Sequence, residues 1–380
     1  MYKAKIVGTG HTPFGKFKLP EERLALDAIT AALADAEMTS RDIDAFYCGN
    51  VFGTLLAGQR CLRELGLAGA PVINVDNACS SSATALQLAL QAIECGAIGT
   101  ALVFGVECLS RLGGGTLPLD PQDFWVSQGL TMPALYAMRA KCYMHQFDVG
   151  LDTLADVVVK NRAHGALNAR AQFSDGVTRQ QVLASRPVAD PLTLYMCCPS
   201  TADGAAAIVL TRKRHKGKAS PVAVLASVVQ SGIHKTAPAD MTYAEITRRT
   251  ARLAYRQAKV RPADVDIAEV HDAFSIAELL YYEALGFCDD GHAACLLASG
   301  RTALGGDIVV NPSGGLIAKG HPPGATGVAQ VVEVCEQLQG RSGARQVPGA
   351  RIGLTHVTGG GISGMDHAAC SIHILSAATS

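Results

Sequence analysis

The chain has 380 residues, of which 48% are apolar and 17% charged, and its formal net charge is zero. This length predicts two or three domain-sized units, and the scarcity of charged residues predicts helices that are covered on all sides. A neutral chain without a long basic run lacks the electrostatic footprint of a protein that binds nucleic acid or an anionic membrane surface, so we expect a small-molecule substrate.

The first predicted elements belong to an internal repeat. Residues 32–52 contain a helical stretch, a polar turn, an Asp-Ile-Asp step and a short apolar strand. Residues 254–274 repeat this order without a gap, with Asp-Val-Asp at the step, so that Asp44 corresponds to Asp266. The repeat predicts two related halves.

Two segments with helical patterns, 77–93 and 321–332, contain no Asp, Glu, Lys or Arg. A helix without a charged face is usually sandwiched between layers, so each half should place one central helix between two sheets. A strand–helix–strand order implies parallel pairing of the strands. The predicted flanking strands are 71–76 and 99–107 in the first half, and 307–315 and 350–357 in the second.

The segment between the halves is predicted to be an insertion. Gly and Pro residues punctuate 112–125, after which 129–147 and 153–167 have helical patterns. Apolar residues here are candidates for the lining of a substrate pocket, although apolar residues at helical spacing are more often core. The candidates are Leu130, Met132, Leu135, Tyr136 and Met138.

Cys79 follows a predicted strand and stands at the first turn of an uncharged helix. Unpaired backbone N–H groups and the positive end of the helix dipole favour a thiolate there, so we expect a lowered thiol pKa and a nucleophilic role. The alternative is a small buried structural cysteine, which is the commoner role of this residue.

His321 stands at the equivalent junction of the second half, between Gly320 and Pro322. Pro322 and Pro323 cannot lie deep in a helix, so His321 should sit at the helix mouth, where its imidazole can meet the thiol from the other half. The alternative is a helix-capping histidine.

His271 lies at the end of a predicted strand and precedes a predicted amphipathic helix within 269–287. Strand ends in parallel sheets often carry functional residues, but a satisfied polar residue at a strand terminus is an equal alternative. Further along, the glycines at 359–361 suit a tight turn whose N–H groups approach a ligand.

The sequence disfavours a secreted protein, a membrane-spanning protein and a zinc-binding protein. The first residues lack the apolar segment of a secretory signal, and no apolar run reaches the ~18 residues that cross a bilayer, which favours a cytoplasmic location. The twelve cysteines are then expected to be reduced thiols. They form no CxxC pair, and the adjacent Cys197 and Cys198 lack the spacing of a zinc site, so we expect no metal.

Together these motifs resemble the thiolase superfamily over essentially the whole chain. The segment NVDNACSSS around Cys79, the segment GGLIAKGHPPGAT around His321 and the glycine turn near the C-terminus occur in the family's order and spacing. The sequence HDAF, which begins at His271, is similar to that of the sterol-carrier-protein type and archaeal-type thiolases.

The resemblance implies an α/β protein with a five-layered α-β-α-β-α fold, built from two similar halves. We expect residues 1–114 with 199–214 to form the N-terminal half, 115–198 an inserted loop domain that covers coenzyme A and the acyl chain, and 219–380 the C-terminal half. The family also implies a homodimer or homotetramer, and its archaeal-type members imply a small OB-fold partner protein. Acyl-CoA and CoA would be substrates, without a permanently bound cofactor.

The resemblance also assigns roles to residues. Cys79 would take the acyl group as a thioester, His321 would activate the thiol, and the N–H groups of Cys79 and Gly359 would form an oxyanion hole. His271 and His321 would hold the thioester oxygen of the second acyl group while carbon attacks carbon. The residues expected to contact substrate are Gly320, Gly360 and Met132.

The sequence departs from the family at one position. Many thiolases carry a CxGG motif whose cysteine is the second acid/base, and Val357 stands at that position here. Valine cannot transfer a proton, so His271 is expected to take over the role, to which the neighbouring His356 could add.

The expected function is that of a CoA-dependent acetyl-CoA C-acyltransferase, which runs a reversible Claisen condensation or cleaves a 3-oxoacyl-CoA through a Cys79 acyl-enzyme. Two alternatives stay open. The enzyme could deliver the acyl group to a non-CoA acceptor or cleave an aldol, or the chain could be a subunit that works with a small OB-fold partner. The presence of Cys79, His271 and His321 argues against the aldol branch, because aldol cleavage needs no acyl-enzyme.

Overall fold

Ten strands form one mixed sheet in the computed structural model, which describes residues 2–66, 69–214, 217, 220–233, 240–360 and 366–377. The strand order is β10-β9-β11-β12-β8-β1-β7-β4-β2-β3, and β5 and β6 form a separate small pair. The strands are β1 (Lys5–His11), β2 (Ala45–Gly49), β3 (Val72–Val75), β4 (Thr100–Cys108), β5 (Pro187–Ala189), β6 (Leu192–Thr193), β7 (Asp203–Thr211), β8 (Val222–Ser231), β9 (Ile267–Glu269), β10 (Val309–Val310), β11 (Ile352–Gly359) and β12 (Ala369–Ala377).

The sheet consists of two halves with the same strand arrangement. One half is β3-β2-β4-β7-β1 and the other is β10-β9-β11-β12-β8, and they join where β1 pairs with β8. In each half the first three strands are parallel to one another, and the fourth runs antiparallel to its neighbour. The predicted strand–helix–strand units are therefore confirmed in both halves.

A matching pair of aspartates supports the internal repeat. Asp44 comes directly before β2, and Asp266 comes directly before β9. One oxygen of Asp44 accepts two backbone N–H groups at the start of β4, both at 2.8 Å. One oxygen of Asp266 accepts two at the start of β11, at 2.8 and 2.9 Å. The two carboxylates thus perform the same task in the two halves, which is to tie the start of one strand to the start of its neighbour.

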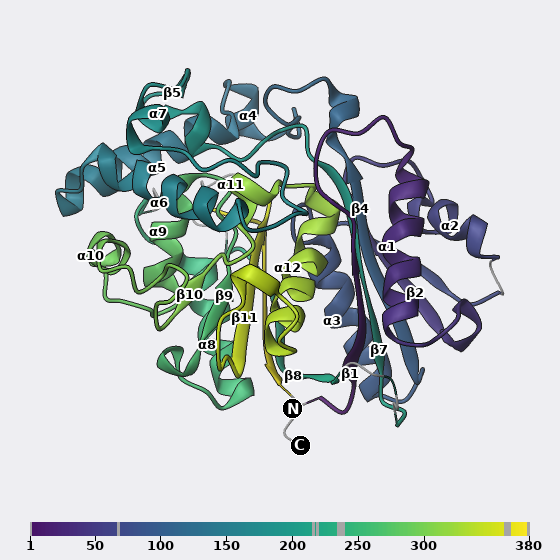
Figure 1. Ribbon diagram of the computed structural model, residues 1–380. Helices are drawn as coiled ribbons and strands as arrows, with labels where there is room; N and C mark the ends of the chain where they lie inside the picture. Colours follow the sequence, from purple (N-terminus) through teal and green to yellow (C-terminus); the bar gives the residue numbers. More distant parts are fainter. Residues whose placement is uncertain are drawn as a thin grey trace.

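Three layers of helices enclose the two halves of the sheet. The first half is covered on its outer face by α1 and α2 and the second by α8 and α9, while α3 and α12 lie between the halves (Figure 1). These helices are α1 (Glu21–Asp35), α2 (Ala57–Leu62), α3 (Ser81–Glu94), α8 (Glu245–Ala258), α9 (Ser275–Ala284) and α12 (Pro323–Leu338). The five-layered α-β-α-β-α fold and the central position of the two uncharged segments are confirmed. None of the described helices is long and apolar enough to cross a membrane.

Glycines let the central helices approach closely. A Cβ atom added to Gly327 of α12 would lie 2.6 Å from the backbone nitrogen of Ala83 in α3. One added to Gly105 of β4 would lie 2.1 Å from the carbonyl oxygen of Gly324 at the start of α12. Contacts this short leave room for hydrogen alone, so glycine is required at both positions. The first turns of α3 and α12 consequently lie next to each other.

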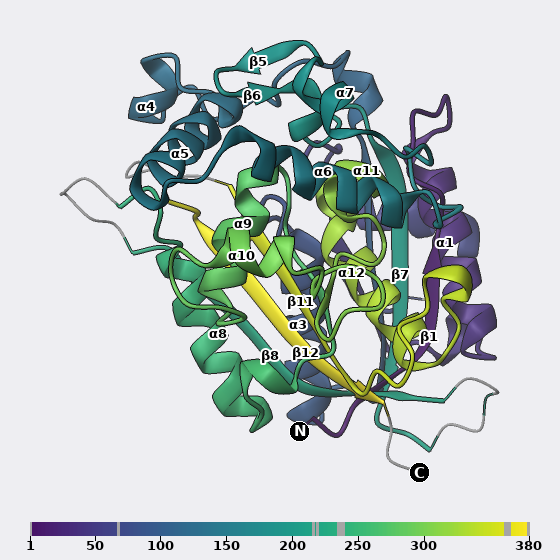
Figure 2. The ribbon, with the colours of Figure 1, turned by 60° about the vertical axis from the view of Figure 1, so that its left-hand side comes forward.

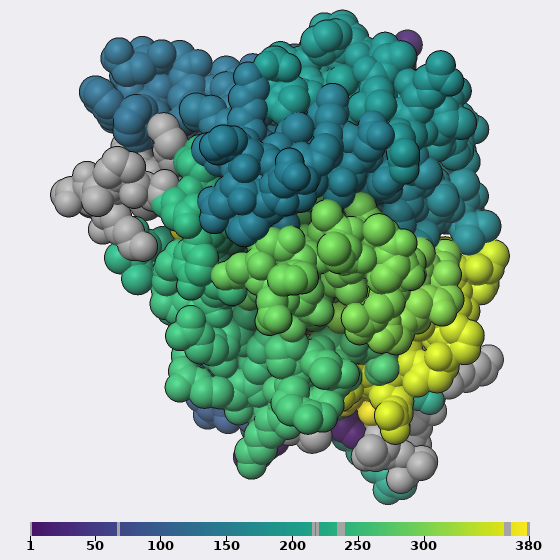
Figure 3. All heavy atoms as spheres, turned by 90° about the vertical axis from the view of Figure 1, so that its left-hand side faces the viewer, coloured from purple at the N-terminus to yellow at the C-terminus, as the bar shows by residue number. Residues whose placement is uncertain are grey.

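The segment between the two halves lies at one end of the molecule. It contains α4 (Phe124–Ser127), α5 (Met132–Phe147), α6 (Leu151–Gly165) and α7 (Arg179–Leu183), and Figures 1 and 2 show them together above the sheet. The helices predicted at 129–147 and 153–167 are confirmed as α5 and α6. In the space-filling view of Figure 3 this segment, in blue and teal, rests on the green surface of the second half.

The expectation of an amphipathic helix after His271 is wrong. All ten residues of α9 are buried, because α5 and α6 of the inserted segment pack against this helix. The buried Glu278 carboxylate lies 2.7 Å from the Lys160 ammonium and also accepts the hydroxyl hydrogen of Tyr282. This pairing offsets the cost of burying the charge. Helix α9 is therefore internal.

Candidate active site

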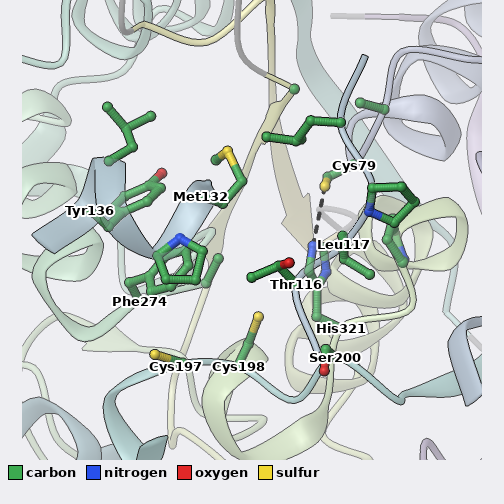
Figure 4. Close-up of a pocket in the computed structure, with 18 of the residues that line it drawn as sticks. Cys79, Thr116, Leu117, Met132, Tyr136, Cys197, Cys198, Ser200, Phe274 and His321 are labelled. Carbon is green, nitrogen blue, oxygen red and sulfur yellow. Dashed lines mark hydrogen bonds between the residues drawn. The ribbon is translucent and has the colours of Figure 1, made fainter. Parts of the chain in front are cut away.

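A cavity of about 840 Å³ lies beneath the inserted segment, and Cys79, His271 and His321 all line it. Figure 4 shows Cys79 and His321 facing each other on one side of the cavity, with Tyr136 and Phe274 on the other. The apolar part of the lining from the inserted segment includes Leu117, Leu119, Trp125, Val126, Leu130, Met132 and Leu135. The cavity is therefore a predominantly apolar chamber with a polar cluster at the helix ends.

Four of the five apolar candidates from the inserted segment line this cavity. Met138 does not, and its side chain belongs to the exposed surface of α5. Met132 lies near the middle of the chamber in Figure 4. Gly320 is not part of the lining either. Its φ of +107° instead turns the chain sharply into His321, a conformation that glycine adopts without steric cost.

Cys79 stands on a tight turn between β3 and α3. The preceding residue, Ala78, has a left-handed backbone with φ +49°, which costs a non-glycine residue roughly 1–2 kcal/mol. The turn is held because the backbone N–H of Asn77 donates to the Ser81 hydroxyl oxygen at 2.9 Å. Strain of this kind is common where a reactive side chain must be presented to a ligand. The turn places the Cys79 sulfur at the start of α3, in the cavity wall.

His321 is oriented as a base toward this thiol. Its Nε2 atom lies 3.2 Å from the Cys79 Sγ atom, and its Nδ1 atom lies 2.8 Å from the Thr326 hydroxyl oxygen. The Thr326 hydroxyl donates its own hydrogen to the Pro322 carbonyl oxygen at 2.9 Å. It therefore accepts the Nδ1 hydrogen of His321, which leaves Nε2 unprotonated and able to accept the thiol hydrogen.

The lowered pKa that the helix start led us to expect for Cys79 is wrong. Burial raises the pKa of the Cys79 thiol to about 12, outweighing the backbone N–H groups of Gly360 and of Cys79 itself, which lower it. Burial also lowers the pKa of His321 to about 3, with a smaller contribution from the Lys319 ammonium. The resting pair is thus a neutral thiol and a neutral imidazole, because charge separation is costly in this environment.

His271 follows β9 and approaches His321 edge-on. The ring centroids are 4.9 Å apart and the ring planes are inclined by 87°. Burial lowers the pKa of His271 well below its usual value, and the nearby histidines add to the shift. Its buried Nδ1 atom has no hydrogen-bond partner among the described residues. Because the ring is neutral and lines the cavity, it can accept a proton from a bound substrate.

Asp272 connects the two histidine segments. Its carboxylate accepts the backbone N–H of Leu316 at 2.6 Å and the side-chain N–H of Asn161 at 2.8 Å. Leu316 belongs to α11 (Gly315–Lys319), the short helix that leads directly to His321. The carboxylate thus ties the segment that carries His271 to the segment that carries His321.

The glycine turn offers two candidate donors for the expected oxyanion hole. Gly360 has φ +59° and lines the cavity, and its backbone N–H lowers the pKa of the Cys79 thiol. Gly359 packs against the Cys79 turn, where an added Cβ atom would lie 2.2 Å from the Asn77 carbonyl oxygen. Gly361 lies outside the described residues. Gly360 is therefore a candidate oxyanion donor beside the expected pair of Cys79 and Gly359.

His356 does not reach the cavity. It is fully buried, its Nε2 atom lies 3.0 Å from the Thr247 hydroxyl oxygen of α8, and its ring packs on Tyr281 of α9. Successive side chains of a strand point to opposite faces, and this position of β11 faces the outer helices. The suggested contribution of His356 to proton transfer therefore has no geometric support. Val357 is buried at the position of the family's second cysteine.

Several residues of the site were not found from the sequence. Thr326, which fixes the His321 tautomer, lies in the first turn of the predicted second central helix, and that position was the available signal. His367 and Asp366 line the cavity from the segment before β12, without a motif that marks them. Cys197 and Cys198 also line it, although their spacing had served only to exclude a zinc site.

Cys79, His271 and His321 also carry side chains of the kind that bind metal ions. The ligand atoms of Cys79, His271 and His321 all lie within 4.8 Å of one another, and this is the one such group within the described ranges. A metal would require the thiolate and neutral imidazoles. The raised thiol pKa and the direct contact of the thiol with the His321 imidazole favour a nucleophile and base instead.

Two family descriptions match nearly the whole chain. Residues 4–214 match "Thiolase, N-terminal domain", and residues 227–373 match "Thiolase C-terminal domain-like". The gap between the matches runs from the end of β7 into β8, where the chain passes from the first half of the sheet to the second.

Three relatives are similar over more than nine-tenths of this chain. The benzoylsuccinyl-CoA thiolase subunit BbsB of Thauera aromatica is 38% identical, covering 97% of this chain and 98% of the relative. An acetyl-CoA acetyltransferase of Methanothermobacter thermautotrophicus is 38% identical, covering 95% and 97%. Sterol carrier protein 2 of Homo sapiens is 37% identical, covering 93% of this chain and 69% of the relative.

Solved structures are similar over nearly the whole chain. A chain of an Ltp2-ChsH2(DUF35) aldolase superposes with a TM-score of 0.85 and 25% identity, covering 98% of this chain and 97% of that chain. The strand order, the thiol and imidazole at the two central helix starts, and these matches agree with one another. The chain therefore belongs to the thiolase family, as an acyltransferase related to the sterol-carrier-protein type and the archaeal type.

Proposed function

We propose that this protein is a CoA-dependent thiolase that works through an acyl-enzyme on Cys79. The observation that carries the proposal is the pairing of the Cys79 thiol with the Nε2 atom of His321, whose other nitrogen is held by Thr326. A buried thiol beside an imidazole of fixed tautomer is the arrangement that nucleophilic catalysis needs.

In the first half-reaction, the Cys79 sulfur attacks the carbonyl carbon of an acyl-CoA while His321 takes the thiol hydrogen. Negative charge develops on the carbonyl oxygen, and the backbone N–H groups of Cys79 and Gly360 are its donors. The carbon–sulfur bond to CoA then breaks, and the CoA sulfur takes the proton back from His321. The products are acyl-Cys79 and free CoA, and the imidazole is again neutral.

In the second half-reaction, His271 removes a proton from the α-carbon of a second acyl-CoA. The carbanion attacks the thioester carbon of acyl-Cys79, a carbon–carbon bond forms and the bond to the Cys79 sulfur breaks. The proton that His271 took from the α-carbon passes through the adjacent His321 to the Cys79 sulfur, so both imidazoles end neutral. The reverse sequence, with CoA as the nucleophile that releases the acyl group, cleaves a 3-oxoacyl-CoA. The lowered pKa of His271 supports this role, because the ring stands neutral in the cavity wall and can accept the proton.

CoA takes part in this scheme as a substrate that comes and goes, without a permanently bound cofactor. We assign residues 115–198 as its cover, between an N-terminal half of 1–114 with 199–214 and a C-terminal half of 219–380. The apolar lining that the inserted segment contributes to the cavity supports this division.

Aldol cleavage is the second candidate, since the similar solved structure is an aldolase. A retro-aldol step needs a base and a stabilised enolate but no sulfur nucleophile. The direct contact between Cys79 and His321 favours acyl transfer instead. Delivery of the acyl group to an acceptor other than CoA would use the same acyl-enzyme.

Assembly with further chains forms part of the proposal. β3 is an edge strand, and Leu55 and Leu56, in the loop between β2 and α2, are 91% and 62% exposed. An open strand edge beside exposed leucines suits pairing with a second copy, so we expect a homodimer or homotetramer. The likeness to a chain of a complex with a DUF35 protein supports a small partner, such as an OB-fold protein.

The test is the intact mass of the protein after incubation with acetyl-CoA. One acetyl group is expected on Cys79, and the Cys79→Ser and Cys79→Ala variants should remain unmodified. The control is Cys142→Ser, an exposed cysteine of α5 outside the cavity, which should leave acetylation unchanged. Thiolysis of acetoacetyl-CoA should then depend on Cys79. Turnover by Cys79→Ala, or a wild-type enzyme that is never acetylated, would exclude the acyl-enzyme and favour the aldol route.

A further inference from the structure

His367 contacts the peptide segment that supplies an oxyanion donor. It is 6% exposed, and its Nδ1 atom lies 2.7 Å from the Gly360 carbonyl oxygen. The same glycine lines the cavity beside the Cys79 turn, and its backbone N–H lowers the pKa of the Cys79 thiol. We propose that His367 is a positioning residue, which holds Gly360 in its left-handed conformation and thereby keeps this N–H directed at Cys79. The inference rests on the acyl-enzyme function proposed above.

The hydrogen bond of His367 has a defined direction. A carbonyl oxygen can only accept, so Nδ1 carries the hydrogen. Burial, together with the Arg139 guanidinium, lowers the pKa of His367, so the ring is neutral and its Nε2 atom is an acceptor. The Tyr136 hydroxyl lies 2.8 Å from Nε2 and donates to it. Tyr136 therefore selects the tautomer that can bond to Gly360.

The support for His367 extends to two further elements. The Tyr281 hydroxyl of α9 lies 3.4 Å from the Tyr136 hydroxyl and 3.2 Å from that of Thr358. The Tyr136 ring stacks on Phe274, with centroids 4.4 Å apart and planes inclined by 21°. The network therefore ties α5, α9 and the end of β11 around one imidazole. All of these side chains are buried, and such buried networks restrain the rotamers of their members.

The restraint matters because glycine has the widest backbone freedom of any residue. The N–H and the C=O of Gly360 belong to the two peptide units on either side of its Cα atom. A bond to the carbonyl limits rotation about Gly360, and so limits the directions in which the N–H can point. An oxyanion donor works when it is fixed before the reaction, since reorienting it during the reaction raises the barrier.

Two substitutions of His367 distinguish a positioning role from a role in packing alone, because their side-chain amides lie at different distances from the Gly360 carbonyl. In His367→Asn, the side-chain amide N–H can occupy the place of Nδ1–H and donate to Gly360. In His367→Gln, the amide lies at the place of Nε2 and cannot reach the carbonyl. The control is His373→Asn, which alters another fully buried histidine, in β12, whose Nδ1 atom bonds the Ser227 hydroxyl away from the cavity.

The readouts are the single-turnover rate of Cys79 acetylation by acetyl-CoA, its KM, and the rate of Cys79 alkylation by iodoacetamide. We expect His367→Gln to lower the acetylation rate roughly 10- to 100-fold with KM changed less than about threefold, since loss of one oxyanion donor costs about 10²–10³. His367→Asn should recover most of that rate, and His373→Asn should match the wild type. Tyr136→Phe should lower the rate about 3- to 10-fold, the value of one net hydrogen bond.

Alkylation distinguishes this inference from the proposed function. The Gly360 N–H favours the thiolate, so His367→Gln should slow alkylation of Cys79 at a fixed pH, whether or not the protein uses acyl-CoA. The positioning role would be overturned if His367→Gln were acetylated and alkylated at the wild-type rates. It would also be overturned if His367→Asn and His367→Gln lowered these rates equally. A wild-type protein that is alkylated but never acetylated would overturn the proposed function and leave the alkylation comparison valid.

Discussion

The Nε2 atom of His321 lies 3.2 Å from the Sγ atom of Cys79, although 242 residues separate them in the chain. Each residue stands at the start of one central helix, and the two helices come from different halves of the repeat. The nucleophile and its base are therefore brought together by the packing of the halves.

The first prediction concerns the pH dependence of Cys79 reactivity. Since burial raises the pKa of Cys79 to about 12 and lowers that of His321 to about 3, the pair stays neutral across the neutral range. The thiolate fraction, and with it the rate of iodoacetamide alkylation, should rise about tenfold per pH unit between about pH 7 and 10. Peptide mass spectrometry with the exposed Cys142 as an internal reference measures this. A plateau beginning near pH 7 would show a thiolate–imidazolium pair instead.

The second prediction separates the two half-reactions. His271→Asn should retain acetylation of Cys79 to within about tenfold, while acetoacetyl-CoA thiolysis and condensation fall about 10²- to 10⁴-fold, the usual contribution of a positioned acid/base. His356→Asn is the matched control, because His356 faces α8 and α9 away from the cavity, and it should keep both steps. Rapid-quench acetylation and steady-state thiolysis give the two rates. Loss of carbon–carbon chemistry in His356→Asn alone would reverse the assignment.

The third prediction tests the contact between the central helices. Gly327→Ala places a methyl group 2.6 Å from the Ala83 backbone nitrogen, and overpacking of this kind costs about 1–3 kcal/mol. The free energy of unfolding in urea should fall by that amount. The acetylation rate should fall as well, because the displaced helices carry Cys79 and His321 at their starts. Gly176→Ala, at an exposed glycine with open space around it, should leave both quantities unchanged.

The fourth prediction concerns stability in acid. Burial lowers the pKa of His373 to about 4 in the folded protein, whereas an unfolded histidine has a value of about 6.5. Between these values the unfolded chain binds a proton that the folded protein does not, so the free energy of unfolding decreases as the pH falls. Each such histidine contributes about 1.4 kcal/mol per pH unit in that window.

His373→Asn removes one of these groups and keeps a hydrogen-bonding side chain beside Ser227. The loss of unfolding free energy between pH 7 and 5 should therefore be smaller in the variant by about 2 kcal/mol. Urea titrations at the two pH values measure the difference. An unchanged loss would mean that His373 is already protonated in the folded protein.

The sequence was sufficient for features that depend on local pattern. The absence of Asp, Glu, Lys and Arg from two segments identified the central helices. The repeat around Asp44 and Asp266 identified the two halves. Cys79 and His321 followed from their positions at helix starts. These features are recognisable because burial and backbone geometry restrict the residue types in a short stretch of chain.

The features that depend on three-dimensional surroundings were not predictable in this way. The sign of the Cys79 pKa shift depends on how completely distant segments bury the thiol. The choice between Gly359 and Gly360 depends on the path of a turn, which a count of residues does not reveal. His356 could have been placed correctly, since alternation along a strand puts it on the opposite face from its neighbours.

The join between the two halves has a consequence for how the enzyme can be divided. A polypeptide containing one half would carry either the thiol or the imidazole, so neither fragment could form the acyl-enzyme by itself. Restoring activity from two separately produced fragments would depend on the glycine-lined contact of α3 and α12 re-forming. The distance between the Cys79 sulfur and the His321 nitrogen is thus set by how the two halves of the chain pack together, much as at the interface of a dimer.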